Sequence, residues 1–513
     1  MKVKFILTLA LGLMVSLAAA PGTAQDKQGS GPDFESFTWT EINDDAAWSP
    51  RAGLQVVELR NTFYMMGGRT PIDPRIIPVP GASEIWSDVW RSRDKGASWR
   101  RILDTAGEHH WPPRAYFEAL TKGRYMYVLG GQDFNIIDNP FPGGPEQIPV
   151  SQFFNDVWRS RDGEHWTQMT AAAGWEGRAG LTAVVHRGEI YVMGGSFNDD
   201  EAIGPAGPAR VYFNDVWKSR NGSDWELLTD DAPWAKRAGA RVVSKGGYLY
   251  LVGGEAGFLC QPQPCDPPYF NDVWRSRDGV EWELVTDDAP WSPRPGHVVV
   301  VYRNHMVLFG GFGLSDDFTD PFGAGNPLDV WVSRNGYDWR QVSDSPWNAV
   351  SPEEGKYDFD ALVARSGRGF GRKAIYTFGG DRETFDFTDL DNYLNVDNDV
   401  WSFAPHLRRG GHWDKDAVAT VPTEPSLSAA PNPFNPSTMI QFNVPAASRV
   451  ELEIFDIGGR RLRTLVREEM AAGSHTVEWN GRDIDGRAVA SGVYLSRLRI
   501  GETVLTERLV LTK

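Results

Sequence analysis

A pair of adjacent glycines ends an apolar run six times in this chain, and this repeat restricts the fold more strongly than any other feature. The period is 57 to 69 residues, counted between the first glycines of the pairs, which are Gly67, Gly130, Gly194, Gly253, Gly310 and Gly379. The runs before the glycines are apolar at consecutive positions, as expected for a strand covered on both faces. One repeat cannot bury these faces alone, so the pattern predicts stacked copies of one supersecondary unit.

Tryptophans recur in phase with the glycines. Each glycine pair is followed, after a variable insert, by Asp-Val-Trp, whose aspartates are Asp88, Asp156, Asp215, Asp272, Asp329 and Asp399. In five copies another tryptophan lies eight or nine residues beyond that motif, at Trp99, Trp166, Trp225, Trp282 and Trp339. We therefore expect four-stranded units in which the glycine pair ends the second strand and Asp-Val-Trp lies in the third.

This combination resembles the kelch repeat, and the six copies cover about residues 37–413. The resemblance implies a six-bladed β-propeller like the central domain of galactose oxidase. A closed ring of blades also removes the need for sheet edges between neighbours. The predicted fold class is all-β, with a six-bladed β-propeller followed by a small immunoglobulin-like β-sandwich. A fold resemblance of this kind says little about the ligand.

Two segments are candidates for the strand that closes the ring. The sixth copy has Trp401 but lacks the usual turn and the outer tryptophan that follow it in the other copies. The segment from Trp39 to Ile42 looks like an outer strand without a blade of its own. We expect this N-terminal strand to complete the sixth blade, and Trp413 is the alternative.

The turn between the third and fourth strands resembles the Asp-box of sialidases and other propellers. One copy runs from Ser160 through Asp162 and Gly163 to Trp166. Asp or Asn before Gly favours a tight hairpin, because Gly accepts positive φ and the side chain can bond its own turn. We interpret these aspartates as structural and assign no catalytic residue.

Long inserts separate the second and third strands of each unit. Because strands alternate in direction, the inserts and the connections between blades should emerge on one face. Long loops on a rigid ring commonly carry binding residues. The inserts cover residues 69–87, 132–155, 196–214, 255–271, 312–328 and 381–398.

The connections between blades place a tryptophan and an arginine at equivalent points in five copies. The candidate binding residues are Trp48, Arg51, Trp111, Arg114, Tyr116, Trp175, Arg178, Trp234, Arg237, Trp291 and Arg294. The arginines could form a cationic ring that forks onto carboxylates, and the tryptophans could stack on sugars. Packing between blades and pairing with acidic loops explains the same residues, since arginine here also resembles the kelch consensus. The sixth copy departs from the pattern, with Trp347 and a distant Lys356.

A second β unit follows a polar linker. Its segments include an alternating strand from Val450 to Asp456 and a stretch from Gly473 to Gly481. Alternation of this kind indicates one buried face. From about residue 427 to 513 the chain resembles the FlgD-like immunoglobulin fold and the type A sorting domain of type IX secretion substrates. That resemblance implies export and surface attachment or release.

The first residues look like a processing signal, with Lys2 and Lys4 ahead of an apolar stretch and small residues near Ala24. The predicted organisation is a signal peptide (1–24), a linker (25–37), the propeller (38–413), a second linker (414–428) and the sorting domain (429–513). No later stretch is long and apolar enough to span a bilayer. We expect a secreted or cell-surface protein.

Charge and cysteine content narrow the partners. The chain carries 52 Lys and Arg against 68 Asp and Glu, so repulsion makes nucleic acid an improbable partner. The two cysteines, Cys260 and Cys265, lie in one loop and are expected to form a disulfide after export. Acidic clusters in the loops could attract calcium, but their spacing matches no defined calcium loop. No cofactor is predicted, and solvated charge is the default interpretation.

Two classes of function fit these observations. The preferred one is a non-enzymatic exported binding protein that recognises a glycan or a surface protein through the loop-rich face. The alternative is a carbohydrate-active enzyme, either sialidase-like or similar to a kelch-type sialic acid mutarotase. A complete sialidase set is not visible, because only Arg114 and Tyr116 can be offered for it. A copper radical oxidase is disfavoured, because both cysteines are assigned to one loop.

Overall fold

A computed structural model places most of the chain downstream of residue 31. The described residues are 32–513 without 78–81, 106–109, 139–146, 198–210, 258–268, 314–326, 349–354, 367–372, 383–393, 406–425, 431–433, 435–437, 445–447, 457–459, 471–472, 485–486, 502 and 513. Three predictions therefore lie outside these residues: the signal peptide, the Cys260–Cys265 disulfide and the position of Trp413. Within the described part, no helix is both long and apolar enough to cross a bilayer.

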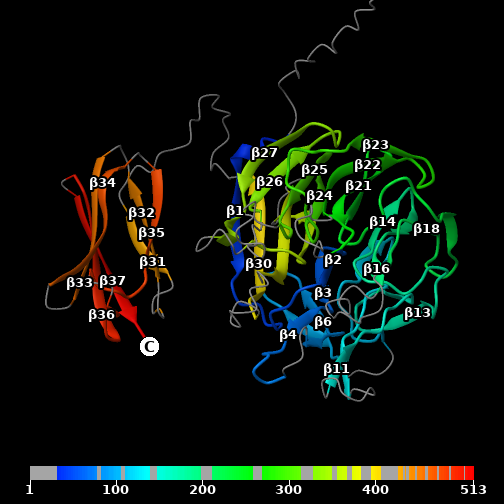
Figure 1. The fold of residues 1–513 in the computed structure, drawn as a ribbon, viewed down its shortest axis with the longest axis horizontal. Helices are drawn as coiled ribbons and strands as arrows, with labels where there is room; N and C mark the ends of the chain where they lie inside the picture. Colours follow the sequence, from blue (N-terminus) through cyan, green and yellow to red (C-terminus); the bar gives the residue numbers. More distant parts are fainter. Residues whose placement is uncertain are drawn as a thin grey trace, which may run out of the picture.

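Six four-stranded antiparallel sheets surround a central axis and form the blades of a β-propeller (Figure 1). Blade 1 contains β2 (Gln55–Leu59), β3 (Thr62–Met66), β6 (Val89–Ser92) and β7 (Arg100–Leu103). Blade 2 contains β8 (Glu118–Lys122), β9 (Tyr125–Leu129), β12 (Val157–Ser160) and β13 (Trp166–Thr170). Blade 3 contains β14 (Thr182–His186), β15 (Glu189–Met193), β18 (Val216–Ser219) and β19 (Glu226–Thr229).

The remaining blades follow the same order from the axis outward. Blade 4 contains β20 (Arg241–Lys245), β21 (Tyr248–Glu255), β22 (Tyr269–Ser276) and β23 (Trp282–Thr286). Blade 5 contains β24 (Val298–Tyr302), β25 (His305–Phe309), β26 (Asp329–Ser333) and β27 (Trp339–Asp344). Blade 6 contains β28 (Asp360–Arg365), β29 (Lys373–Asp381), β30 (Val396–Pro405) and β1 (Phe37–Asn43). Short 3₁₀ turns η1 (Phe34–Ser36) and η3 (Pro346–Asn348) flank blades 5 and 6.

The N-terminal strand closes the ring, as the sequence predicted. Strand β1 pairs antiparallel with β30, and Trp39 lies opposite Phe403. The Trp39 ring stacks on Phe403 with centroids 4.7 Å apart. Because first and last parts of the propeller share one sheet, opening the ring requires breaking a complete strand pairing.

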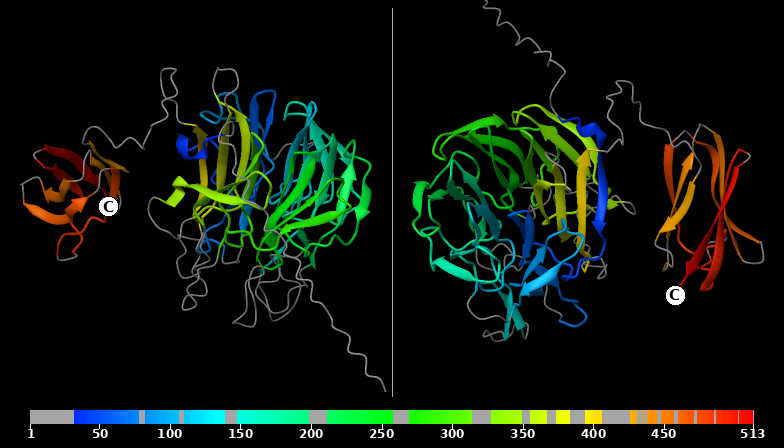
Figure 2. Two further views of the ribbon diagram at one scale, coloured as in Figure 1. Left: turned by 90° about the horizontal axis from the view of Figure 1, so that it is seen from above. Right: turned by 180° about the vertical axis from the view of Figure 1, so that it is seen from behind.

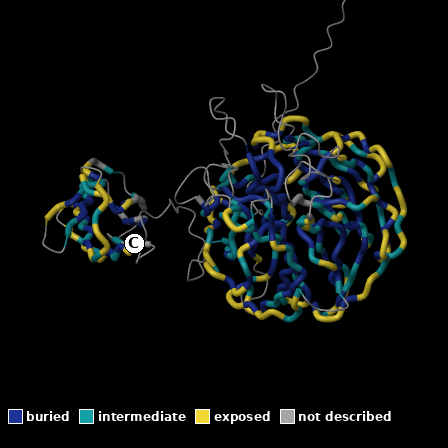
Figure 3. Tube along the Cα trace, turned by 60° about the horizontal axis from the view of Figure 1, so that its bottom comes forward, coloured by how far each residue is buried: buried dark blue, intermediate teal, exposed yellow. Residues whose placement is uncertain are grey.

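The apolar core consists of six clusters, one between each pair of neighbouring blades. The cluster between blades 6 and 1, for example, joins Tyr376 and Phe378 to Phe63 and Met65. Buried segments accordingly concentrate inside the ring and exposed ones along its outer edge (Figure 3). This arrangement explains the apolar runs before the glycine pairs, since second strands contact a neighbour on each face.

The glycine pairs are required by backbone geometry. Gly130 and Gly131 adopt φ of 63° and 95°, a region that residues with a Cβ rarely occupy. A Cβ on Gly131 would lie 2.6 Å from the Phe117 Cβ and 2.8 Å from the Ala115 carbonyl oxygen. Glycine therefore allows the end of the second strand to pass directly over the connection that enters the same blade.

The Asp-box turns have a structural role, because their polar side chains bond within the turn. In blade 2 the Ser160 hydroxyl accepts the Gly163 N–H at 2.9 Å, and the Asp162 carboxylate accepts the His165 N–H at 2.9 Å. The Trp166 indole then donates to the Gly163 carbonyl at 3.0 Å. These bonds hold the hairpin of blade 2 in shape, and the Asp162 carboxylate is used within its own turn.

Several inserts extend the opposite face as β-hairpins. In blades 1 to 3 the described parts of the inserts form two-stranded sheets, namely β4 (Arg69–Pro71) with β5 (Ser83–Ile85), β10 (Asn135–Asp138) with β11 (Gln147–Val150), and β16 (Ser196–Phe197) with β17 (Val211–Tyr212). In blades 4 and 6 the second and third strands themselves run on past the glycine pair. Paired strands thus extend the insert face in five of the six blades, as separate hairpins in blades 1 to 3 and as continued blade strands in blades 4 and 6.

The C-terminal unit contains two antiparallel sheets, coloured orange to red in Figure 2. One sheet contains β31 (Ser426–Ala430), β32 (Thr438–Val444) and β35 (Gly473–Trp479). The other contains β33 (Ser448–Asp456), β34 (Arg461–Met470), β36 (Gly492–Ile500) and β37 (Thr503–Leu511). Residues such as Ile440, Leu452, Trp479 and Leu509 form its buried core. The domain start expected at residue 429 falls inside β31, which begins three residues earlier.

Candidate functional site

The five predicted arginines lie inside the walls between blades. Each guanidinium forms a bidentate ion pair with the aspartate of the Asp-Val-Trp motif and donates to the carbonyl oxygen of the first glycine of the Gly-Gly pair. In Arg114, for example, the Nη1 lies 2.7 Å from the Asp156 Oδ1 and 2.8 Å from the Gly130 carbonyl oxygen. The other pairs are Arg51–Asp88, Arg178–Asp215, Arg237–Asp272 and Arg294–Asp329. These arginines are at most 1% exposed, so the structure favours the packing interpretation over a cationic ring open to ligands.

Aromatic rings cover these guanidinium groups in four blades. The ring is supplied by the residue two positions before the motif aspartate, namely Trp86, Phe154, Phe213 or Phe270. The distances from the guanidinium carbon to the ring centroid are 3.7 to 4.6 Å. A planar, weakly hydrated guanidinium suits both the carboxylate fork and the ring, which is why arginine recurs at this place.

Blade 6 replaces this arrangement with two cations. Lys356 Nζ lies 2.6 Å from both the Asp397 and the Asp399 carboxylates. Arg382 Nε approaches Asp397 at 2.6 Å, and its Nη2 lies 3.6 Å from Asp399. Asp397 occupies the position of the covering aromatic residue in the other blades. An ammonium group lacks the planar fork of arginine, so a second carboxylate and a second cation complete this arrangement, while the Lys356 Nζ lies 5.2 Å from the centroid of the Trp347 ring.

The predicted tryptophans are also part of the walls. Trp48, Trp111, Trp175, Trp234 and Trp291 are each 1% exposed. Each meets the outer tryptophan of the next blade edge-on, as Trp175 meets Trp225 with centroids 6.0 Å apart. A ligand on the surface cannot reach these rings, so sugar stacking on them is not supported by their positions.

Tyr116 is the exception among the predicted residues, because it lies at the mouth of the central channel. It occupies one position of a ring that we call the mouth ring, which contains one residue from each blade entry: Gly53, Tyr116, Gly180, Gly239, Gly296 and Asp358. Backbone N–H groups donate around this ring, from Gly53 to Asp358, Tyr116 to Gly53, Gly180 to Tyr116, Gly239 to Gly180 and Asp358 to Gly296, at 2.8 to 3.1 Å. The mouth ring lies on the insert face, since the residue before it bridges the start of the insert in five blades, as Ala115 bridges Gln132.

Side chains from three blades meet at the mouth ring. The Arg69 Nε donates to the Tyr116 hydroxyl at 2.5 Å, and the Arg69 Nη2 lies 2.6 Å from the Asp381 Oδ2. Burial raises the pKa of the Tyr116 phenol, and the nearby carboxylates of Asp358 and Asp381 act in the same direction. The phenol is therefore a neutral hydrogen-bonding group at every physiological pH.

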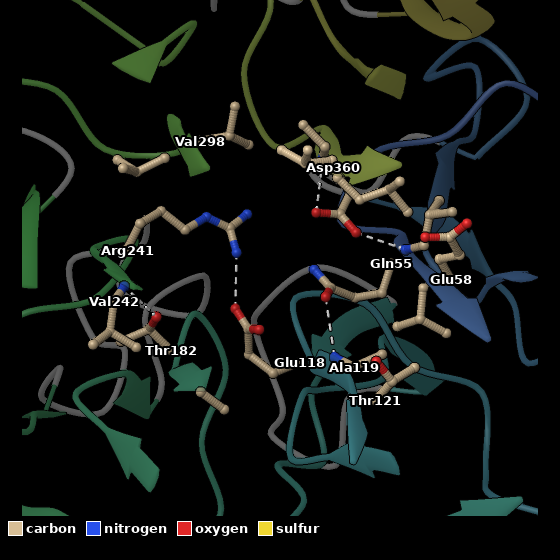
Figure 4. A pocket seen from close by; sticks show the side chains of 17 residues that line it. Gln55, Glu58, Glu118, Ala119, Thr121, Thr182, Arg241, Val242, Val298 and Asp360 are labelled. Carbon is tan, nitrogen blue, oxygen red and sulfur yellow. Dashed lines mark hydrogen bonds and ion pairs between the residues drawn. The ribbon is translucent and has the colours of Figure 1, made fainter. Parts of the chain in front are cut away.

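Below the mouth ring, the innermost strands enclose a cavity of about 330 Å³ along the axis (Figure 4). Its upper wall is formed by the first residue of each innermost strand: Gln55, Glu118, Thr182, Arg241, Val298 and Asp360. Three of these side chains accept a backbone N–H from the next blade: Gln55 from Ala119, Thr182 from Val242 and Asp360 from Val56. The channel is thus polar at this level, and hydrogen bonds from its lining side chains link neighbouring blades.

One ion pair crosses the channel. The Arg241 Nη1 lies 2.8 Å from the Glu118 Oε1, and the Arg241 Nε donates to the His297 carbonyl oxygen at 3.0 Å. Burial raises the pKa of Glu118 to about 8, although the guanidinium of Arg241 opposes that shift. Burial also raises the pKa of Asp360. The channel therefore presents a guanidinium beside the Glu118 carboxyl, which takes up a proton near neutral pH, a combination suited to binding or protonating oxygen-rich ligands.

Sequence reasoning found Tyr116 and missed Arg69, Glu118, Arg241, Asp358, Asp360 and Asp381. These residues belong to no motif, and Glu118 and Arg241 are 123 positions apart. A usable signal was present, because the copies of the repeat differ in chemistry at these positions, as they do at the first residue of each innermost strand. As for metals, no group of three or more His, Cys, Asp or Glu in the described residues is placed to hold an ion.

Comparisons with known proteins agree with the two-part architecture. The sequence model of the FlgD Ig-like domain matches residues 435–498. Kelch domain-containing protein 1 of Mus musculus is 29% identical over 245 residues, which cover 44% of this chain and 55% of that protein. The chain thus spans about half the length of this relative. The present chain carries a kelch-type propeller and a FlgD-like immunoglobulin domain.

Two further similarities concern bacterial proteins. N-acetylneuraminate epimerase 2 of Escherichia coli O6:H1 is 27% identical over 252 residues, covering 43% of this chain and 64% of that protein. Among solved structures, that of YjhT shares 18% identity, covers 66% of this chain and 93% of its own, and gives a TM-score of 0.45. The all-β class rests on the sheets of the chain itself, which are four-stranded and antiparallel in every blade.

Proposed function

We propose that this protein is an exported, non-enzymatic binding protein that recognises a glycan or a surface protein through the insert face of its propeller. The supporting observation is the contrast between the two faces. The turn face consists of short hairpins whose polar groups bond one another, as in the Asp162 turn. The insert face carries strand-borne extensions around a polar channel mouth, and loops on a rigid scaffold are where binding residues concentrate.

Exposed apolar side chains on the inserts support a binding role for this face. Ile137 and Phe197 stand on the hairpins of blades 2 and 3 and are 42% and 37% exposed. Phe197 packs on Phe153 of the neighbouring insert with ring centroids 4.8 Å apart. Such a pair offers a preformed apolar contact beside the polar mouth, a mixture typical of recognition surfaces.

The export and attachment part of the proposal rests on the C-terminal domain. The match to the FlgD Ig-like domain agrees with the resemblance to type IX sorting domains that the sequence suggested. The predicted signal peptide and the strongly acidic composition are the further grounds for proposing an extracellular protein that stays in solution or on a surface. Comparing the location of the intact protein with that of a chain truncated before β31 tests this part.

A matched pair of variants tests the binding face. Saturable binding of the full chain to a glycan array, or to proteins from a cell surface, is expected to weaken at least tenfold in Phe197→Ala. The control is Tyr337→Ala, which removes a 63% exposed aromatic residue from the turn face of blade 5. Equal loss in both variants, or in neither, contradicts recognition through the insert face.

A second candidate function, sialic acid anomer exchange, is favoured by one observation. The Glu118 and Arg241 pair places a proton-exchanging carboxyl beside a guanidinium in the channel, and several relatives are named as N-acetylneuraminate epimerases. Anomer exchange needs a proton donor and acceptor, which a carboxyl with a pKa near neutral provides. NMR measurement of N-acetylneuraminate anomer exchange, with Glu118→Gln as the inactive variant, decides between this function and pure binding.

A further inference from the structure

The turn face carries a repeated arginine that contacts within the chain do not explain. It follows the first serine of the Asp-box turn in blades 1 to 5 and is exposed in each, at Arg93, Arg161, Arg220, Arg277 and Arg334. Arg220 pairs with the Glu189 carboxylate at 2.8 Å. Arg161 and Arg277 instead donate to a tyrosine hydroxyl. The guanidinium groups of Arg93 and Arg334 form no hydrogen bond or ion pair with the described part of the chain. No single structural role therefore accounts for the repeat.

The inner hairpins, which join the first and second strands of the blades, add arginines under backbone strain. Arg60, Arg187 and Arg303 occupy the first turn position with φ of 52°, 49° and 44°. Glycine and asparagine favour this left-handed region, whereas long side chains such as arginine do not. Blade 4 makes the same turn with Gly246 and Gly247. Strain that the turn itself does not require is typical of residues kept for a function.

The turn face is positively charged although the chain is acidic. Its inner hairpins cover residues 58–62, 121–125, 185–189, 244–248, 301–305 and 364–373, and its outer hairpins cover residues 92–99, 160–166, 219–225, 276–282 and 333–339. The described residues of these hairpins include fourteen lysines and arginines against nine aspartates and glutamates. The whole chain carries a net charge of −16, so the acidic excess lies elsewhere. Exposed charges more than about 8 Å away are largely screened at physiological ionic strength, so a surface in contact with the turn face meets a local positive excess.

We propose that the turn face docks on an anionic lipid surface, with the exposed arginines of its hairpins contacting lipid phosphate groups. A plane perpendicular to the ring axis meets every blade in the same way, which accounts for an arginine repeated in five blades. A discrete ligand or a single polymer chain contacts only part of the ring. Guanidinium groups form paired hydrogen bonds with phosphate, and each lysine or arginine close to an anionic bilayer adds to the affinity.

The chain also leaves the propeller from the turn face. Strand β30 is the third strand of blade 6 and ends at Pro405, opposite Phe37 at the start of β1. Third strands end on the turn face, so the segment that leads to the C-terminal unit starts there. A surface that holds the C-terminal unit can therefore meet the turn face and leave the insert face free for ligands. This orientation rests on the attachment part of the proposed function, whereas the contact itself rests on the charges of the turn face.

The test is co-sedimentation of the full chain with vesicles of defined composition. Phosphatidylcholine vesicles containing about one-third phosphatidylglycerol are the anionic probe, and pure phosphatidylcholine vesicles are the neutral one. The wild type is expected to bind the anionic vesicles at least tenfold more tightly than the neutral ones at about 0.1 M salt. This preference should disappear at about 1 M salt, because the Debye length falls from about 10 Å to about 3 Å.

A double variant, Arg93→Gln with Arg334→Gln, removes two charges from the turn face. Because neither guanidinium bonds to the described chain, the variant is expected to fold and to melt within about 3 °C of the wild type. Each arginine near the surface contributes about a fivefold factor, so the affinity for anionic vesicles is expected to fall about twenty-five-fold. The matched control is Arg75→Gln with Lys236→Gln, which removes two positive charges from an insert and a blade connection on the opposite face.

A second variant keeps the test independent of folding. Arg60→Asn places a residue that accepts positive φ at a strained turn position, so it should melt no earlier than the wild type. Its affinity for the anionic vesicles is expected to fall about fivefold.

The outcomes separate docking from the proposed function. Docking is overturned if the wild type binds anionic vesicles no better than neutral ones, or if the double variant binds them as tightly as the control does. It is also overturned if the wild type binds heparin, a soluble polyanion, and not the vesicles. These results leave insert-face recognition standing, because that recognition is measured on soluble ligands. A wild type that binds anionic vesicles but no glycan and no protein overturns the proposed function and keeps the docking.

Discussion

The walls between blades and the mouth of the channel are built from the same six copies of one sequence pattern. The two regions differ in how far their residues repeat from copy to copy. In the walls of five blades, the same residues recur and contact one another, as in the Arg114–Asp156 pair and the Trp175–Trp225 contact. At the mouth, equivalent positions hold glycine, tyrosine or aspartate, and the first residues of the innermost strands include an amide, acids, a hydroxyl and a guanidinium.

The contrast shows how to separate structure from function in a repeat protein. A residue present in every copy answers a requirement that every copy shares, and here that requirement is packing against the next blade. A ligand without sixfold symmetry needs contacts that differ from blade to blade. Departures from the repeat are therefore better candidates for binding residues than the repeat itself, provided that they face an accessible cavity.

The largest expected effect comes from breaking a wall pair. Arg114→Ala leaves the buried carboxylate of Asp156 without its cationic partner and with only the Trp158 indole as a side-chain donor. Removing one member of a buried ion pair costs about 3–5 kcal/mol. Both groups are nearly inaccessible, with side-chain exposures of 0% and 9%. The midpoint of urea unfolding measures the loss, and Arg93→Ala on the exposed turn is the control. If the midpoint falls no further in Arg114→Ala than in the control, the Arg114–Asp156 pair does not stabilise the fold.

The next effect concerns the channel and depends on pH. Because burial raises the pKa of Glu118 to about 8, the folded state keeps a proton that the unfolded chain releases above a pKa of about 4.3. This contribution to stability is complete below that lower pKa and is lost as the pH rises towards 8. The stability of the wild type relative to Glu118→Gln is expected to fall by about 1.4 kcal/mol per pH unit in this window.

Denaturant unfolding of both proteins at several pH values checks this prediction. Glu164→Gln, at an exposed position on the turn face, is the matched control and should follow the wild type. Parallel pH profiles for wild type and Glu118→Gln would show that the carboxyl is ionised in the channel at neutral pH and that Arg241 outweighs burial.

A smaller effect is expected from the wall pair of blade 6. Lys356→Ala removes a cation as buried as Arg114, with side-chain exposures of 0% and 9% for Lys356 and Asp399. Arg382 still faces both Asp397 and Asp399, so the carboxylates keep a partner. We expect a loss of about 1–3 kcal/mol, less than for Arg114→Ala. Equal losses in the same unfolding assay would mean that Arg382 does not compensate.

The smallest effect is expected on the turn face. Asp162→Asn should change stability by less than about 0.5 kcal/mol, because Asn221 and Asn335 already fill this position in blades 3 and 5. The Asn221 side-chain oxygen accepts the Ser223 and Asp224 N–H groups at 2.8 and 3.0 Å, as an aspartate would. Thermal melting checks it, and a drop of several degrees would show that the charge of Asp162 is needed.

Much of the fold was visible in the sequence. Glycine pairs, apolar runs and Asp-Val-Trp predicted six blades and their second and third strands, and Trp39 predicted the strand that closes the ring. These predictions succeeded because they depend on local backbone geometry and on burial, which each repeat displays by itself. The boundary predicted at residue 429 falls within the short edge strand β31, whose small residues give only a weak pattern.

The candidate site was much less visible. The sequence nominated repeated arginines and tryptophans, and only Tyr116 among these residues lies at the mouth. No local sequence pattern predicts that Arg69 contacts Tyr116 and Asp381. Tyr116 lies at the entry of blade 2, and Asp381 lies at the end of a strand in blade 6. Such contacts depend on the curvature of the closed ring, which brings residues hundreds of positions apart within hydrogen-bond distance.

The difference between the features that the sequence predicts and those that need the tertiary structure has a simple physical origin. Periodicity, turn chemistry and the alternation of apolar residues act over a few residues, so the amino-acid order is sufficient to specify strands, turns and the number of blades. The burial of the arginines, the mouth ring and the proton held by Glu118 arise only when six sheets close on one axis. Closure removes water from the groups that face inward, and that desolvation sets their pairing and their pKa values.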